Sequence, residues 1–363
     1  MVLFCPSALE HRDRLILCDL HVLCLRNFTH LLPSNRSKPF ASLFARCPSP
    51  LVPYKKQYIN LLSENDAYVY PADRYYSAGN RLSYTSKEYN FWGAAYAHSW
   101  MAWSRYLTLM IHSPKMTRFS VSMTQTMYTP HLDSHTSKAI VMGDHLYAGW
   151  LRANFALFQR APHALEKIFI SLGTVGPDSM AGQTQNWLHG LWGDKTFQGW
   201  HNQLRNEFIF QFNYQWLYQV YILKTRFFSM DILPGVDLAL GNAITHVRLG
   251  SLLRFGYNLS ADFGPNKIGT LFSGGQPFSN HFSFYFFIGA SGSYQPVDIF
   301  IQGNSPQTRG ITHLPDALYA VEGGFALLYR GFRLSFIATN LSKGFEEQPL
   351  SHNIGTAELD IAF

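Results

Sequence analysis

Two short clusters of polar residues could carry chemistry, and the first occupies residues 64–79, ENDAYVYPADRYYSAG. Its acid, amide and hydroxyl groups belong to Glu64, Asn65, Asp66, Asp73 and Ser77, with Arg74 among them. Oxygen atoms of these kinds are hard ligands that suit Ca²⁺. The alternative is a plain turn between two strands in which Asp73 and Arg74 form an ion pair. This cluster is therefore either a cation site or a polar turn.

The second cluster lies within residues 176–190, GPDSMAGQTQNWLHG, which carry glycines and a proline and lack strand alternation. This pattern predicts a loop that runs into a short helix. On a helix, Gln185 and His189 are four residues apart and share a face. Asp178 or Thr184 is expected to cap that helix. The alternative to a reactive histidine is a hydrogen-bonded polar network in a lumen.

A histidine beside carboxylate and amide groups suits the hydrolysis of an ester. A neutral imidazole, which titrates near about pH 6.5 in general, can accept a proton from water. The developing oxyanion needs positive charge or hydrogen-bond donors, which Ca²⁺ and an asparagine amide supply. No G-x-S-x-G motif of a serine nucleophile occurs in the sequence. The sequence therefore favours an activated water as the nucleophile.

Long segments with a period of two must position these clusters. In FIFQFNYQWLY, residues 208–218, aromatic side chains from Phe208 to Tyr218 occupy one strand face, and Gln211, Asn213 and Gln215 occupy the other. The same alternation recurs in residues 119–127, 249–257, 282–294, 331–341 and 356–363. We interpret all of these segments as strands.

The length of these strands distinguishes a barrel from a sandwich. Eleven residues span about 36 Å, or roughly 28 Å when tilted, which exceeds the apolar band of about 25 Å on an outer-membrane barrel. Strands of soluble proteins average only about five or six residues. The last strand closes on Phe363, as in bacterial outer-membrane proteins. We predict an all-β, antiparallel transmembrane β-barrel of about 12 strands in the bacterial outer membrane, with a short helix near the active site.

The composition supports this class and excludes others. Charged residues make up 14% and aromatic residues 16%, and the net charge of +6 is scattered. Without a basic patch, binding to nucleic acid is not expected. No window approaches the roughly 18 consecutive apolar residues of a transmembrane helix. A closed β-barrel can still cross a membrane, because neighbouring strands hydrogen-bond all of its backbone N–H and C=O groups.

The first 53 residues differ from the rest of the chain. The four cysteines all lie there and match no zinc template, at positions Cys5, Cys18, Cys24 and Cys47. An acidic residue, Asp19, interrupts the apolar stretch that a signal peptide needs. We interpret residues 1–53 as a poor signal peptide or an incorrectly assigned start, and residues 54–363 as the barrel domain.

In this order and spacing, four motifs resemble the outer-membrane lipid A 3′-O-deacylase family over about residues 57–363. They are Asn65-Asp66, DRYYSAG (73–79), GP (176–177) and QNWLHG (185–190). The segments MYTP (127–130), GDHLYAG (143–149) and GWHNQLRNE (199–207) also stand where this family places them.

The resemblance implies a Ca²⁺-dependent enzyme that hydrolyses the ester of the 3′ acyloxyacyl group of lipid A, with its active site near the outer rim. By position, His189 matches the general base and Gln185 the glutamine four residues before it. Asn65 and Asp66 match the pair near the metal and the scissile carbonyl, with Asp66 as metal ligand. Ser77 stands where the family has a threonine. The expected partners are lipopolysaccharide and outer-membrane lipids, and we expect a monomer.

Two positions depart from the family pattern. His135 and Lys138 are both candidates for a family lysine that follows MYTP, and Lys195 stands where some members carry a glutamate. Both changes bear on the lipid A phosphates, which lysine and arginine bind well. Two alternative functions stay open: a porin-like or structural barrel without activity, and a phospholipase-type barrel that cleaves glycerophospholipid esters.

Overall fold

The computed structural model describes residues 51–70, 74–109, 114–131, 143–193, 196–269, 272–306 and 314–363. The prediction for residues 1–53 falls almost entirely outside these ranges, so it stays a prediction. Among the described residues, no helix is both long and apolar enough to span a bilayer.

The described residues form mostly strands, with a few short helices between them. The strands are β1 (Tyr58–Asn65), β2 (Tyr75–Thr85), β3 (Met116–Thr129), β4 (Ala148–Arg160), β5 (Ala164–Val175), β6 (Glu207–Tyr218), β7 (Val220–Lys224), β8 (Ser229–Gly241), β9 (Ile244–Tyr257), β10 (Ser283–Asp298), β11 (Leu318–Tyr329), β12 (Phe332–Leu341) and β13 (His352–Ala362). The helices are η1 (Asp66–Tyr68), η2 (Trp100–Tyr106), η3 (Pro177–Ser179), α2 (Ala181–Trp192), η4 (Gly199–Asn202), η5 (Leu259–Ala261) and α3 (Ile299–Gln302).

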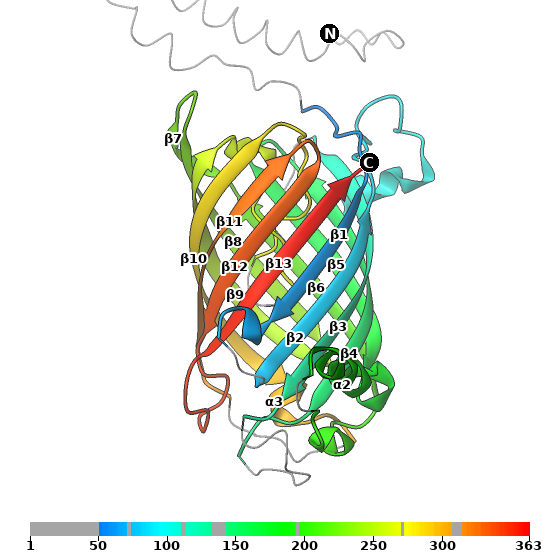
Figure 1. The fold of residues 1–363 in the computed structure, drawn as a ribbon. Coiled ribbons are helices and arrows are strands. Elements are labelled where there is room, and N and C mark those ends of the chain that lie inside the picture. Colours follow the sequence, from blue (N-terminus) through cyan, green and yellow to red (C-terminus); the bar gives the residue numbers. More distant parts are fainter. Residues whose placement is uncertain are drawn as a thin grey trace, which may run out of the picture. The chain divides into compact units, whose positions relative to one another are not determined.

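The strands close into an antiparallel barrel (Figure 1). Apart from β6 and β7, which do not pair with each other, each strand pairs with its neighbours in the chain. β1 pairs with β13, and the pairing of β6 with β8 completes the ring. β7 begins just after β6, beyond Gln219, and also pairs with β8. β6 and β7 therefore form one interrupted strand of the wall. Counted in this way, the described strands form a twelve-stranded barrel. The predicted fold class is confirmed.

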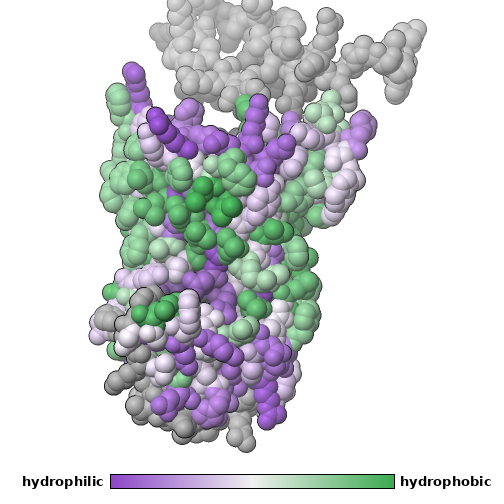
Figure 2. Space-filling view, turned by 45° about the vertical axis from the view of Figure 1, so that its right-hand side comes forward, coloured by the Kyte–Doolittle hydropathy of each residue, from purple (hydrophilic) through white to green (hydrophobic). Residues whose placement is uncertain are grey.

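The period of two in the sequence separates the outer face of the wall from the lumen. In β6, Gln211 and Gln215 are buried toward the lumen, whereas Phe208 and Phe210 on the opposite face are exposed. Hydrophobic side chains cover much of the middle of the visible wall, and hydrophilic ones gather toward its two ends (Figure 2). An apolar band between polar ends is the surface that a bilayer requires.

The described parts of the segment between β9 and β10, residues 258–269 and 272–282, fold into the lumen instead of extending from the barrel. They contribute the buried residues Leu259, Phe263 and Phe272 to an apolar cluster with wall residues such as Leu233 and Tyr285. This segment has no period of two, so the sequence did not indicate where it lies.

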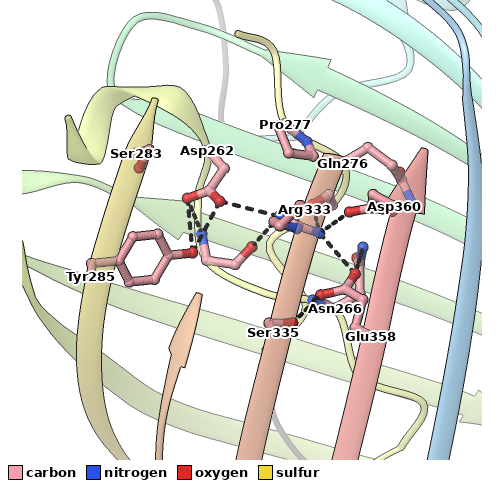
Figure 3. A network of polar contacts seen from close by, with 12 residues as sticks. Asp262, Asn266, Gln276, Pro277, Ser283, Tyr285, Arg333, Ser335, Glu358 and Asp360 are labelled. Carbon is pink, nitrogen blue, oxygen red and sulfur yellow. Dashed lines mark hydrogen bonds and ion pairs between the residues drawn. The ribbon is translucent and has the colours of Figure 1, made fainter. Parts of the chain in front are cut away.

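Ion pairs hold this segment to the wall (Figure 3). Arg333 of β12 lies 3.2 Å from Asp262 of the segment, 2.8 Å from Glu358 and 2.7 Å from Asp360 of β13. Asp262 also pairs with Arg254 of β9 at 2.7 Å. All five side chains are at most 1% exposed. Every charge in this network therefore depends on its partners, because water does not solvate it.

We expect Arg333→Met to lower the free energy of unfolding by about 3–5 kcal/mol, because it leaves buried carboxylates without their cation. Tryptophan fluorescence during urea unfolding in lipid vesicles measures this change. The matched control is Arg226→Met, which alters an exposed arginine between β7 and β8. Equal stability of the two variants would contradict a structural role for the network.

Candidate active site

The candidate site lies on the outer face of the wall, at the end of the barrel that carries α2. On β1, Leu61 is exposed and points outward with Ser63 and Asn65, whereas Asn60 and Glu64 are fully buried toward the lumen. Strand pairing extends the row of Asn65 across the sheet. The row consists of Gly355, Asn65, Ala78, Met127 and Gly149.

A glycine at each end of this row allows a helix to lie directly on the wall. A Cβ atom at Gly355 would overlap Tyr68 of η1. A Cβ atom at Gly149 would overlap Ser179 and Ala181 at the start of α2. Asn65, Ala78 and Met127 therefore lie between two helices that rest on the outer wall. Figure 1 shows α2 outside the barrel, beside β3 and β4.

A β-bulge at Ser77 redirects the hydroxyl group of this residue next to the row of Asn65. The pairing of β2 with β3 shifts register between Tyr76 and Ala78. Such a shift adds one unpaired residue and changes the direction of its side chain. The hydroxyls of Ser77 and Thr129 are buried and hydrogen-bonded, 2.5 Å apart. Thr129 was not singled out from the sequence, although it lies within the MYTP motif.

Helix α2 presents Gln185 and His189 on its buried face. These side chains are 3% and 8% exposed, whereas Trp187 and Leu191 are 63% and 62% exposed. The predicted helix and the shared face of its two polar residues are therefore confirmed. The exposed apolar residues on the other face suit contact with lipid.

Two aromatic residues after the helix hold these polar side chains in place. Gln185 Oε1 accepts a hydrogen bond from Trp200 Nε1 at 2.9 Å. The ring of His189 packs edge-to-face on Phe197, with 5.1 Å between the ring centroids. Phe197 and Trp200 share a buried apolar cluster with Ala78. Because Ala78 pairs with Asn65, the cluster connects the histidine-bearing helix to the strand pair that carries Asn65.

The predicted side-chain cap of the helix is wrong. Met180, in the left-handed conformation, is the N-cap residue, and it makes no capping hydrogen bond through its side chain. The hydroxyl of Thr184 donates to the carbonyl of Met180 at 3.1 Å. The backbone N–H of Asp178 is bound by Asn206, so Asp178 belongs to η3 rather than to the start of α2.

Asn65 and Asp66 lie where β1 ends and η1 begins. Asn65 Oδ1 accepts a hydrogen bond from the N–H of Ala67 at 2.7 Å and so caps η1. Asp66 is 1% exposed, and its Oδ2 accepts from the N–H of Arg74 at 2.9 Å. These bonds fix both side chains beside the outer row.

Glu64 does not join them, although the sequence places it in the same cluster. Its carboxylate lies in the lumen, where it accepts hydrogen bonds from the Tyr76 hydroxyl at 2.7 Å and the Ile268 N–H at 2.8 Å. The alternation of the strand separates Glu64 from its neighbour Asn65.

A second histidine near this end, His145, belongs to a different environment. It lines a lumen cavity of about 200 Å³ together with Tyr76, Tyr128 and Trp150. Burial lowers its pKa to about 4, so the ring is neutral at working pH. Its Nδ1 lies 2.8 Å from the carbonyl of Leu146, and its ring stacks on Tyr128. It therefore faces the lumen, whereas His189 faces the outer wall.

The oxygen donors at the end of β1 and on β2 and β3 are of the kinds that calcium accepts. Within the described ranges there is no group of three or more His, Cys, Asp or Glu side chains that could hold a metal. Calcium also accepts hydroxyl, amide and carbonyl oxygens, in flexible geometry. The Asp66 carboxylate, the Ser77 and Thr129 hydroxyls and the carbonyls at the end of β1 are donors of these kinds.

Four residues of the sequence hypothesis lie outside the described residues. They are Asp73, His135, Lys138 and Lys195. The ion pair of Asp73 with Arg74, the replacement for the family lysine and the effect of Lys195 therefore stay predictions.

A closed barrel with a lipid-facing wall and a helix packed against its outside has the architecture of an outer-membrane β-barrel protein. A family model described as "Outer membrane protein LpxR" matches residues 32–363, and the chain belongs to this family. The resemblance to the outer-membrane lipid A 3′-O-deacylases is thereby confirmed. The protein is a lipid A deacylase of the bacterial outer membrane.

One solved structure shares this fold, and two further barrels are more distantly similar. LpxR from Salmonella typhimurium is 16% identical, with a TM-score of 0.68 over 84% of this chain and 100% of that chain. The β-domain of the Bordetella autotransporter BrkA is 9% identical, with a TM-score of 0.41 over 85% and 99%. The NalP translocator domain from Neisseria meningitidis is 8% identical, with a TM-score of 0.39 over 96% of each chain. No curated protein matches the chain by sequence.

We expect Gly149→Leu to lower activity by about 10²-fold, because a side chain there pushes α2 and its histidine away from the wall. The initial rate of acyl release from lipid A in detergent measures this loss. Leu172→Phe, at an exposed position on the outer face of β5 that does not line this part of the wall, is the control. Full activity of the glycine variant would show that close contact of α2 with the wall is not needed.

Proposed function

We propose that this chain hydrolyses the ester that holds the 3′ acyloxyacyl group on lipid A, with a water molecule activated by His189. The observation that carries this proposal is the position of α2, which lies on the lipid-facing wall with its buried polar face toward the strands of Asn65 and Ser77. The 3′ position is taken from the family resemblance and not from the geometry.

His189 is the proposed general base. Its ring is held against Phe197, and its helix is fixed to the wall at Gly149. A histidine held in one orientation can take a proton from water as that water attacks the ester carbonyl. When the tetrahedral intermediate collapses, the imidazolium can return the proton to the leaving sugar oxygen. Gln185 is a positioning residue, because its amide joins the same helix face to Trp200.

The residues at the end of β1, across from α2, are proposed to bind the carbonyl oxygen of the ester. The Asn65 side chain lies on the outer row, where its amide N–H₂ can donate to that oxygen. Asp66 is the proposed calcium ligand, with the hydroxyl of Ser77 nearby on β2. A bound calcium ion would supply positive charge for the developing oxyanion.

The structure also favours a substrate that arrives from the bilayer. The connections at the α2 end include 130–147, 176–206 and 299–317, which are longer than the turns 161–163 and 330–331 at the other end. Long loops are typical of the extracellular side of these barrels, where lipopolysaccharide resides, although segments 86–115 and 258–282 at the other end are also long. An ester in the outer leaflet can reach the outer face without entering the lumen.

The porin-like alternative is disfavoured by the contents of the lumen. Segment 258–282 is bound there by Arg254 and Arg333, both fully buried. Purified protein with calcium, incubated separately with lipid A and with phospholipid vesicles, tests all three functions. Loss of an acyloxyacyl group from lipid A alone supports the proposal, fatty acid release from phospholipid favours a phospholipase, and conductance without acyl release favours a channel.

A further inference from the structure

An open groove runs along the outer wall directly below the candidate site. Two residues from Asn65 along β1, the next outward row contains Ala357, Ser63, Asn80 and Gln125. The row after that contains larger apolar side chains, which are Leu334, Leu359, Leu61, Leu82 and Met123. Together these rows line a groove of about 620 Å³.

The groove exists because small or mutually bonded side chains lie between taller apolar ones. Ala357 contributes only a methyl group. The hydroxyl of Ser63 is hydrogen-bonded to Asn80 Oδ1 and to the Tyr68 hydroxyl, at 3.0 Å each. The Ser63 hydroxyl is therefore hydrogen-bonded within the protein on both sides. Leu61, Leu82 and Met123 are 46%, 56% and 53% exposed and form the apolar sides.

The groove is continuous with the candidate site. The pair Ser63 and Asn80 lies next to the pair Asn65 and Ala78 on the same outward face. Gln125 Nε2 donates to the carbonyl of Ser179 at 2.6 Å, so this side of the groove is bonded to the loop that begins α2. With about 6.6 Å between successive rows, the apolar row lies roughly 13 Å from Asn65.

We propose that this groove binds the hydrocarbon chain of the acyl group that is cleaved, and that it thereby selects chain length. This inference rests on the proposed function, because it places the ester carbonyl near Asn65. A chain that extends from that carbonyl along the wall meets Ser63 and Ala357 first, then Leu61 and Leu82. A chain too short to reach the apolar row forfeits the hydrophobic burial there.

Ala357→Phe tests the proposal by filling the groove. We expect it to lower kcat/KM for lipid A with long 3′ chains by about tenfold, while lipid A with short 3′ chains is cleaved as before. The matched control is Ala290→Phe, because Ala290 is an exposed alanine on β10, distant from β1 around the barrel. The control should leave both rates unchanged.

A second variant tests the groove without adding bulk. Leu82→Ser removes an exposed apolar side chain from the groove. Its control is Leu249→Ser, which removes a similarly exposed leucine from β9. We expect a loss of several-fold for long chains with Leu82→Ser alone. If all four variants keep the wild-type chain-length profile, the groove does not bind the chain, and the proposed hydrolysis still stands. If wild-type protein releases no acyl group from any lipid A, the proposed function itself fails and the groove proposal with it.

Discussion

Replacing His189 with alanine is expected to lower the rate of acyl release from lipid A by about 10²–10⁴-fold, because the attacking water loses its general base. The barrel should remain folded, since the histidine lies on an external helix and not in the wall. Mass spectrometry of lipid A over a time course measures the rate. A difference in migration between unheated and heated samples in gel electrophoresis reports the folded barrel.

The matched control for this prediction is His201→Ala. His201 lies in η4, close in sequence to Trp200, but its side chain is exposed. The control should keep full activity. A His189→Ala protein that is folded and retains wild-type rates would contradict the proposed base. A loss in both variants would indicate instead that the region after α2 matters as a whole.

The second large effect is expected from Asp66. Asp66→Asn should lower activity by about 10²–10³-fold at a fixed calcium concentration, comparable to the removal of one oxyanion-stabilising group. It should also raise the calcium concentration needed for half-maximal rate, because the proposed ligand loses its charge. Titration of calcium in the activity assay, together with calorimetry of calcium binding, measures both changes.

Asp178→Asn is the control for Asp66, because Asp178 is an exposed carboxylate in η3, beside α2. Chelation should abolish the activity of wild-type protein, and added calcium should restore it. Unchanged calcium affinity in Asp66→Asn would show that the ion binds elsewhere. Activity that survives chelation would remove calcium from the proposed function altogether.

The sequence predicted the barrel because its physical requirements are local. A wall with lipid on one side and polar groups on the other must alternate at every residue, and this pattern is visible in β6 without any partner strand. The long strands and the helix with Gln185 and His189 on one face follow from the same kind of local pattern. The path of segment 258–282 was not predicted, because its position depends on ion pairs with distant strands.

The arrangement of the site was predicted only in part. Motif order identified Asn65, Asp66, Ser77, Gln185 and His189, and the structure places them on or against the outer wall at one end of the barrel. The two glycines that allow η1 and α2 to lie on the wall depend on strand register, which a single sequence does not give. For the same reason the sequence grouped Glu64 with Asn65, although these neighbours point to opposite faces.

The most direct test of the proposed function is positional mass spectrometry of lipid A after incubation with the purified protein and calcium. We predict a product that lacks the acyloxyacyl group at the 3′ position and keeps its other acyl chains. Intact lipid A, or removal of a chain from any other position, would contradict the assignment.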